Sequence, residues 1–438
     1  MTTIFDTVES QVRSYCRAFP AVFKKAVGAE LFDESGRRYI DFFAGAGTMN
    51  YGHNNPLIKR RILDYIQQDG IIHGLDLHTT AKRAFLETFE SVILRPRHLN
   101  YKIQFPGPTG TNSVEAAMKL ARKFTGRNGI VAFTNGYHGM TAGALAATGN
   151  TYHRQVSGSL LNGVTFAPYD GYFGSEVDTI SYLRKLIEDD SSGLDKPAAV
   201  LLESVQGEGG VNVASFKWLQ HIETLCREHD ILLIVDDIQA GCGRTGTFFS
   251  FKPAGITPDI VTLSKSIGAY GLPMSLVLMK PELDCWEPGE HNGTFRGNNL
   301  AFVAATEAIR IYWSDNTLSL AIQHKAHLLR RRLRKLCEEF PAHGLTVRGR
   351  GLFVGMAFEQ FPQLARQISA EAFRRGVILE TCGARDQVIK FLPPLIIEET
   401  MLDEGLNIFA DSVRAVMQQA ANTPAGGLPD SLTQEVHP

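Results

Sequence analysis

Two charged residues follow apolar runs and together could support amine–carbonyl chemistry. Asp236 follows the run Ile231–Val235, and Lys265 comes shortly after the run Ile260–Leu263. Open α/β sheets bind their ligands at the carboxyl ends of such strands. A buried lysine with a lowered pKa can form a Schiff base, and a carboxylate can keep a pyridinium nitrogen protonated. Taken singly, each residue is more often a surface lysine or a helix-capping aspartate, so the pair needs support from other motifs.

A second motif is typical of an anion site. Pro108-Thr-Gly-Thr-Asn112 precedes a helical pattern that begins at Ser113. Small and hydroxylated residues there expose backbone N–H groups to a phosphate, aided by the helix dipole. An ordinary helix cap explains the same residues. No Walker lysine follows, and Gly45-Ala-Gly47 lacks the third glycine of a dinucleotide fingerprint, so both nucleotide-binding alternatives are disfavoured.

Two further loops carry candidate ligand-binding residues. Asn135-Gly-Tyr-His-Gly139 follows the apolar run Ile130–Phe133. An aromatic ring at a strand end, flanked by glycines, can stack on a planar cofactor, although a core tyrosine beside a hydrogen-bonded histidine fits equally. Gly293-Thr-Phe-Arg-Gly-Asn-Asn299 contains Thr294, a possible phosphate donor.

The elements that must position these residues are predicted by short apolar runs with helical patterns between them. Most runs are too uniformly apolar to alternate, as in strands that are buried on both faces. Helical patterns such as Ser113–Phe124 and Phe216–His229 separate them. This order predicts an α/β fold with a mostly parallel seven-stranded sheet. The predicted strands are Lys102–Phe105, Ile130–Phe133, Gly163–Ala167, Ala198–Glu203, Ile231–Val235, Ile260–Leu263 and Ser275–Met279.

Both ends of the chain differ from this pattern. Ala29–Tyr39 holds a turn between two short strand-like runs, and helical patterns after Asn299 cover Ala305–Trp313, His324–Phe340, Ala370–Arg375 and Leu402–Gln419. We therefore expect a smaller α+β domain built from both ends. The predicted bounds are 1–55 and 306–419 for this domain, 56–305 for the large cofactor-binding domain, and 420–438 for a flexible tail.

Composition limits the classes of function. The 438 residues are 44% hydrophobic and 21% charged, with 44 Lys+Arg against 46 Asp+Glu, which excludes wholesale disorder and a basic nucleic-acid footprint. No apolar stretch is long enough for a membrane span, and no signal peptide is evident. The six cysteines form no CxxC pair, so we expect reduced thiols in a cytoplasmic protein rather than a disulfide framework or metal site.

The order and spacing of these motifs resemble the class III aminotransferases, which are fold-type I enzymes dependent on pyridoxal 5'-phosphate. Asp236-Asp-Ile-Gln-Ala-Gly-Cys-Gly-Arg-Thr-Gly246 is similar to the family's Asp-Glu-Val-Gln-x-Gly-x-Gly-Arg-Thr-Gly, and Ser264-Lys265 to its Ser-Lys. Glu203-Ser-Val-Gln-Gly207 resembles the family's Glu-Pro-x-Gln-Gly. The resemblance covers roughly residues 15–418.

The resemblance implies a role for each matching residue. Lys265 would be the Schiff-base lysine and the base that moves the proton, and Asp236 would pair with the pyridine nitrogen. Thr294 would bind phosphate from the neighbouring subunit, since family members share sites across a homodimer or a dimer of dimers. The other implied cofactor-binding residues are Gly110, Thr111 and Asn112 at the phosphate, Tyr137 and Ile238 on opposite ring faces, Gln239 at the phenolic oxygen, and His138.

A narrower resemblance is to the diaminobutyrate–2-oxoglutarate aminotransferases, best known from the ectoine pathway. It is carried by Asp41-Phe-Phe-Ala-Gly-Ala-Gly47, Tyr51-Gly-His-Asn-Asn55, Gln104-Phe-Pro-Gly-Pro-Thr-Gly-Thr-Asn112 and Glu290-His-Asn-Gly-Thr-Phe-Arg-Gly-Asn298. It implies transfer of the amino group of L-glutamate to C4 of L-aspartate 4-semialdehyde, giving L-2,4-diaminobutyrate and 2-oxoglutarate by a ping-pong mechanism.

Two positions depart from the ornithine- and GABA-type members, which usually have arginine at both. Here the residues are Met140 and Lys390. Lysine offers a point charge rather than a bidentate fork, so carboxylate binding must differ. Lys390 and Arg244 are the candidate cations, and a structural role for Arg244 is equally open. Glu208 matches the acidic residue that neutralises such a cation in the family.

The sequence leaves two alternative functions open. One is another ω-aminotransferase, acting on ornithine, N-acetylornithine or GABA; Met140 and Lys390 argue against it. The other is a non-catalytic binding protein on the same scaffold. The intact Asp236 and Lys265 pair argues against that, because a binding protein has no need of a Schiff-base lysine.

Overall fold

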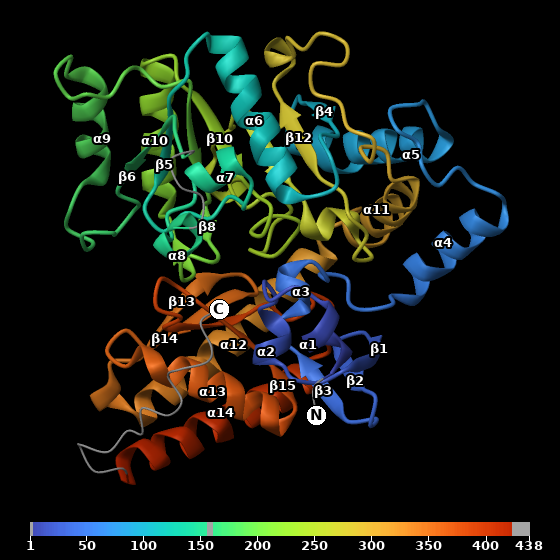
Figure 1. Cartoon of the computed structure of the whole chain (residues 1–438), viewed down its shortest axis with the longest axis vertical. Coiled ribbons are helices and arrows are strands. Elements are labelled where there is room, and N and C mark those ends of the chain that lie inside the picture. Colours follow the sequence, from blue (N-terminus) through green and yellow to red (C-terminus); the bar gives the residue numbers. More distant parts are fainter. Residues whose placement is uncertain (1–2, 156–160, 423–438) are drawn as a thin grey trace.

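The computed structural model describes residues 3–155 and 161–422, and its centre is the expected seven-stranded sheet (Figure 1). The strand order is β4-β12-β11-β10-β7-β5-β6. β12 runs antiparallel to both of its neighbours, and the other pairs are parallel. The prediction of a mostly parallel sheet is confirmed. The strands are β4 (Lys102–Gln104), β5 (Ile130–Phe133), β6 (Val164–Ala167), β7 (Ala199–Leu202), β10 (Leu232–Asp236), β11 (Ile260–Leu263) and β12 (Leu276–Met279).

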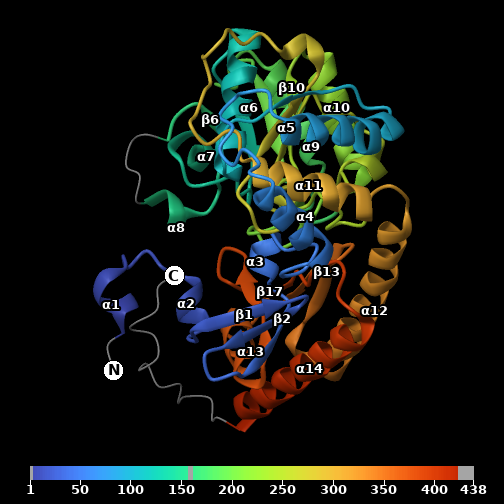
Figure 2. The same ribbon diagram turned by 90° about the vertical axis from the view of Figure 1, so that its right-hand side faces the viewer.

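Helices bury both faces of this sheet, which explains its uniformly apolar strands (Figure 2). In β5, Ile130 and Ala132 belong to the cluster that contains the apolar face of α6 (Gly110–Thr125). Val131 and Phe133 point the other way, and the Phe133 ring lies 5.0 Å from that of Trp218 on α10 (Phe216–Glu228). Alternate side chains therefore serve opposite layers, so every position of the strand has to be apolar.

Further helices flank the sheet and connect it to the rest of the chain. α11 begins at Asn299, earlier than the predicted start at Ala305, because the Asn298 side chain accepts a hydrogen bond from the Ala301 N–H (3.3 Å) and caps the helix. Within the described residues, no helix is long and apolar enough to cross a membrane. The flanking helices include α4 (Pro56–Gln67), α5 (Thr80–Thr88), α7 (Ala142–Ala146), α8 (Thr151–Arg154), α9 (Thr179–Glu188) and α11 (Asn299–Tyr312).

The smaller α+β part draws on both ends of the chain, as predicted. One of its sheets has the order β1-β2-β3-β15, so a strand from the C-terminal third extends three antiparallel N-terminal strands. The other has the order β13-β14-β17-β16 and is antiparallel. Its strands are β1 (Phe23–Val27), β2 (Glu30–Asp33), β3 (Arg38–Asp41), β13 (Thr346–Arg350), β14 (Phe353–Ala357), β15 (Val377–Ile378), β16 (Glu380–Cys382) and β17 (Val388–Phe391).

Helices cover these two sheets, and the last one corrects the predicted tail. α14 (Glu399–Asn422) continues past residue 419, so the first residues of the predicted tail are helical; residues 423–438 lie outside the described residues. The other domain bounds stay predictions. The remaining helices here are α1 (Ile4–Val8), α2 (Tyr15–Ala18), α3 (Ala44–Gly47), α12 (Thr317–Glu339) and α13 (Pro362–Arg375).

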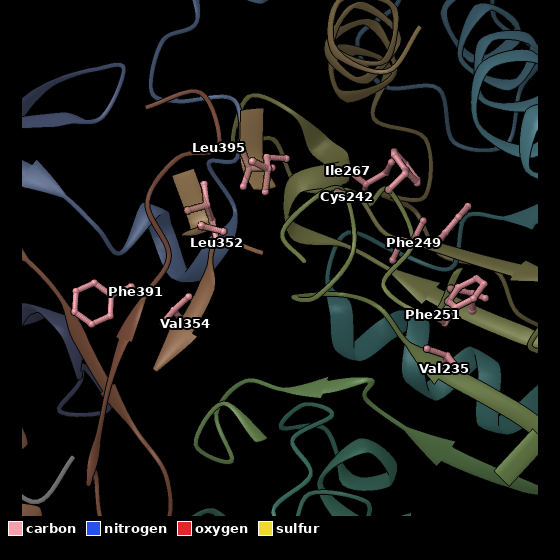
Figure 3. Packing of buried hydrophobic residues seen from close by; sticks show 14 of the residues in the cluster. Val235, Cys242, Phe249, Phe251, Ile267, Leu352, Val354, Phe391 and Leu395 are labelled. Carbon is pink, nitrogen blue, oxygen red and sulfur yellow. The ribbon is translucent and has the colours of Figure 1, made fainter. Parts of the chain in front are cut away.

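One apolar cluster joins the large sheet to the smaller part of the molecule (Figure 3). It runs from the carboxyl end of β10 to the turn between β13 and β14 and on to β17 and the segment after it. Asp236, Lys265 and Lys390 lie on segments of this shared core, beside its members Val235, Ile267 and Phe391. Labelled members are Val235, Cys242, Phe249, Phe251, Ile267, Leu352, Val354, Phe391 and Leu395.

Candidate active site

Lys265 lies just beyond the carboxyl end of β11, in the first residue of the short helix η5 (Lys265–Gly268). Its backbone has φ +51°, a left-handed conformation that is uncommon for a residue with a side chain. Its Nζ donates a hydrogen bond to the carbonyl of Ala46 (2.9 Å), and Gln239 Nε2 donates to the same carbonyl (3.0 Å). Gly45 and Ala46 also have positive φ, and this turn brings the carbonyl into the site. Sequence reasoning missed that contribution.

The surroundings of Lys265 favour a reactive amine. Burial lowers the pKa of Lys265, and the nearby charge of Glu208 opposes that shift only in part. A lysine with a lowered pKa offers its neutral form as a nucleophile or a base.

Asp236 ends β10 and is held from three directions. Its Oδ2 lies 2.7 Å from Nδ1 of His138, while its Oδ1 accepts hydrogen bonds from the Ile238 N–H (3.1 Å) and the Thr262 hydroxyl (3.2 Å). Burial works to lower the pKa of His138, but the hydrogen bond and charge of Asp236 outweigh it and raise that pKa. His138, predicted in the cofactor site, therefore contacts the aspartate and orients it.

The predicted phosphate segment forms the first turn of α6. Thr109 and Asn112 make a capping box, with Asn112 Oδ1 accepting from the Thr109 N–H (3.2 Å) and hydroxyl (2.8 Å). A Cβ added to Gly110 would lie 3.0 Å from Ile238 Cδ1, so the helix start packs directly on Ile238. The Thr111 hydroxyl is hydrogen-bonded to that of Thr141. The helix N-terminus and the Asp236 loop thus adjoin.

Tyr137 is positioned by a buried carboxylate that sequence reasoning did not single out as a site residue. Glu203 accepts hydrogen bonds from the Tyr137 N–H (3.0 Å) and the Gly207 N–H (3.2 Å). Burial raises the pKa of Glu203 to about 7. The sequence feature that could have identified Glu203 is its position at the end of a predicted buried strand.

Lys390 and Glu208 form an ion pair on β17 and the turn after β8 (Val205–Gln206). Lys390 Nζ lies 2.6 Å from Glu208 Oε1, which also accepts from Gln239 Nε2 (3.2 Å). A Cβ on Gly207 would stand 1.7 Å from Gln239 Oε1, so only glycine permits this approach. A second carboxylate, Glu380 on β16, lies 3.0 Å from Lys390 Nζ. Sequence reasoning missed Glu380, although this residue directly follows the apolar run 377–379.

Arg244 was the other candidate cation for a substrate carboxylate. Arg244 is fully buried and donates to the carbonyls of Leu352 (3.1 Å) and Pro393 (2.6 Å) and to Asn50 Oδ1. These contacts favour the structural role for Arg244.

Met140 is 48% exposed. Thr294 is also exposed, and its carbonyl lies 2.7 Å from His73 Nε2. Among the described residues, no hydrogen bond connects Thr294 to the first turn of α6.

The residues fit pyridoxal 5'-phosphate. The first turn of α6 has N–H groups without intrahelical acceptors, which suit a phosphate. A buried carboxylate at Asp236 suits a protonated ring nitrogen, and Lys265 supplies an amine for the aldehyde. Gly110 packing on Ile238 connects the phosphate end to the ring position.

Comparison with known proteins agrees with this geometry. The family described as "Aminotransferase class-III" matches residues 12–413. A diaminobutyrate–2-oxoglutarate transaminase of Bordetella parapertussis is 57% identical over 416 residues, covering 95% of this chain and 96% of the relative. One from Wolinella succinogenes is 56% identical over 416 residues, covering 95% and 97%.

Solved structures agree as well. The ornithine aminotransferase from Toxoplasma gondii, crystallised with partially occupied PLP at its active site, has a TM-score of 0.82 at 26% identity and covers 95% of this chain and 94% of its own. An N-acetylornithine aminotransferase from Stenotrophomonas maltophilia has a TM-score of 0.73 at 26% identity and covers 92% and 99%. With the family match spanning most of the chain, this protein belongs to the class III aminotransferases, enzymes that use pyridoxal 5'-phosphate to move amino groups.

Proposed function

We propose that this chain transfers the amino group of L-glutamate to C4 of L-aspartate 4-semialdehyde, giving L-2,4-diaminobutyrate and 2-oxoglutarate in two half-reactions. The observation that carries the choice of substrate is the 57% identity, over 95% of the chain, to a transaminase named for diaminobutyrate and 2-oxoglutarate. The paired Lys390 and Glu208 beside Lys265 support it, because both half-reactions then use one site whose cation can be exposed or neutralised.

The residues have separate tasks in the proposed mechanism. When bound, pyridoxal 5'-phosphate supplies an electron sink next to the carbon that carries the amino group. Lys265 would hold the cofactor through its amine and would move the proton to and from that carbon. Asp236 would keep the ring nitrogen protonated, and His138 orients Asp236 through their 2.7 Å contact. Tyr137 would lie against the ring, and the 3.0 Å hydrogen bond from its N–H to Glu203 supports that position.

Substrate carboxylates are proposed to bind at Lys390. In the free site, Glu208 neutralises this cation at 2.6 Å. A carboxylate that displaces Glu208 gains the Lys390 ammonium as its partner. A substrate that presents an uncharged end leaves the pair closed. Glu208 and Lys390 thus would let one site accept both glutamate and the semialdehyde.

The competing function is another ω-aminotransferase. The solved structures at 26% identity include an ornithine and an N-acetylornithine aminotransferase, and this likeness supports the alternative. With 2-oxoglutarate as acceptor, we expect kcat/KM for diaminobutyrate to exceed that for ornithine and for GABA by at least about 100-fold. That is the scale on which a site discriminates one extra methylene, the difference between ornithine and diaminobutyrate. A ratio at or below one would favour the alternative.

The proposed assembly is a homodimer or dimer of dimers in which Thr294 binds the phosphate of the neighbouring subunit. Thr294 adjoins exposed apolar side chains that a partner would cover: Phe295 (68% exposed) on its own loop, and Ile71 (53%) near His73. Inactive Lys265→Ala chains mixed with inactive Thr294→Asp chains should regain activity, since one site of each mixed dimer then holds both native residues. Mixed dimers without activity would refute a shared site.

The proposed location is the cytoplasm. All six cysteines, Cys16, Cys226, Cys242, Cys285, Cys337 and Cys382, are free thiols, which suits a reducing compartment.

A further inference from the structure

The Lys390 site contains one cation between two carboxylates that differ in their freedom. The Lys390 side chain is fully buried. Glu208, at 2.6 Å, has a side chain that is 28% exposed, while Glu380, at 3.0 Å, has one that is only 5% exposed. The two carboxylates are therefore not equivalent partners of the same ammonium.

The backbone segments that carry Glu380 and Glu208 also differ in how firmly they are held. Glu380 lies on β16 directly opposite Lys390 on β17, so the ladder of hydrogen bonds holds the two side chains together. Glu208 belongs to the turn between β8 and β9 (Asn212–Val213), outside any strand ladder. Glu208 is thus the carboxylate that can turn away, and Glu380 is the one that must stay.

The negative charges around Lys390 affect the protonation of Glu380. Two carboxylates already surround one ammonium. A substrate carboxylate brings a third negative charge into the site, because Glu208 leaves Lys390 but stays on the neighbouring turn. Burial, reinforced by the charge of Glu208 and opposed by that of Lys390, raises the pKa of Glu380 to about 7. For Glu208, burial works to raise the pKa, but Lys390 and Lys265 outweigh it and lower that pKa. Near neutral pH, Glu380 is the member of the cluster that takes up a proton.

We propose that Glu380 is a positioning residue that stays on Lys390 when Glu208 gives way to a substrate carboxylate, and that Glu380 takes up a proton from solvent as this exchange occurs. The proton binds a carboxylate oxygen of Glu380, and no other bond changes. The inference deepens the proposed function and rests on it for the dicarboxylate character of the substrate.

The other titratable groups that face Glu380 do not account for the proton uptake. Burial raises the pKa of both Tyr15 and Cys382, so these stay neutral in the range of interest. Lys265 is engaged by the cofactor in the holoenzyme. The titratable and charged groups around Glu380 are Lys390 on β17, Glu208 in the β8–β9 turn, Lys265 on η5, Tyr15 on α2 and Cys382 on β16.

The test uses glutarate, an unreactive five-carbon dicarboxylate, bound to the holoenzyme and measured by calorimetry between about pH 6 and about pH 9. We expect the dissociation constant to rise on the order of tenfold across this range, since an added like charge a few ångströms away weakens binding by about that factor. Titrations in two buffers of different ionisation enthalpy should reveal proton uptake that is largest near neutral pH. Pentanoate, with a single carboxylate, serves as the comparison ligand.

Glu380→Gln keeps the shape and an oxygen acceptor for Lys390 but removes the titrating charge. In this variant, glutarate binding should vary by less than about twofold with pH, should be tighter than in the parent at high pH, and should lose the proton uptake. Glu371→Gln is the matched control, because Glu371 pairs with Arg374 and Arg375 on α13 and faces no part of the site. It should reproduce the parent profile.

Two results would overturn the inference: a parent enzyme that binds glutarate without proton uptake, or a Glu380→Gln variant that keeps the parent's pH profile. The first is measured on the unmodified protein, so it decides the matter even if the variant does not fold. Turnover of diaminobutyrate, assayed in parallel, separates this result from the proposed function. Its absence would refute that function and leave the glutarate titration valid.

Discussion

Arg244→Lys distinguishes a structural arginine from a substrate-binding one. Arg244 donates to the carbonyls of Leu352 and Pro393 and to Asn50 Oδ1, three acceptors from three separate segments. A hydrogen bond to a charged group contributes about 1.5–3 kcal/mol. The single ammonium of lysine, on a shorter side chain, can satisfy roughly one acceptor, so losing two should destabilise the fold by about 3–6 kcal/mol.

The assay compares unfolding with kinetics. Urea unfolding of the holoenzyme, followed by tryptophan fluorescence, should show a clearly lower midpoint for Arg244→Lys, while KM for 2-oxoglutarate at a temperature where the variant is folded should stay within about twofold. Arg184→Lys is the control, since Arg184 makes only exposed ion pairs with Glu188 and Glu228, and it should change stability by less than about 1 kcal/mol. The reasoning fails if Arg244→Lys raises KM about tenfold and leaves the unfolding midpoint unchanged.

Two further variants test the buried carboxylates. Asp236→Asn should retain the cofactor, visible in its absorption, but slow transamination on the order of 10²–10³-fold, because it removes a preorganised charge held by His138 at 2.7 Å; parental rates would make Asp236 structural only. Glu203 has its pKa raised from 4.5 to about 7, so the stability it contributes is complete below about pH 4.5 and is lost as pH rises through about 7. Between about pH 5 and about pH 8, the free energy of unfolding of Glu203→Gln should therefore fall less than that of the parent, by up to about 3 kcal/mol. Urea unfolding of the apoenzyme measures this difference. If the free energies of parent and variant change with pH in parallel, Glu203 does not have a raised pKa in the folded protein.

Much of the fold was predictable from local sequence patterns. The seven strands were predictable because both faces of the sheet are covered, which forces uniformly apolar runs such as Ile130–Phe133 and Ile260–Leu263. Helix starts were less predictable. Asn298 and Asn299 look like loop residues, yet Asn298 caps α11 and lets it begin there. The motif around Lys265 likewise identified the family, because covalent chemistry tolerates few residue types.

Side-chain partners depended on segments far apart in the chain. Sequence patterns were enough to predict the fold class, the lysine and the aspartate at strand ends, and the loops beside them. The folded arrangement was needed to show that the Ala46 carbonyl meets Lys265, that buried carbonyls occupy Arg244, and that Glu380 shares Lys390 with Glu208. The physical reason is range: periodicity and capping act between neighbours in sequence, whereas burial and charge act on whatever the folded chain brings within a few ångströms.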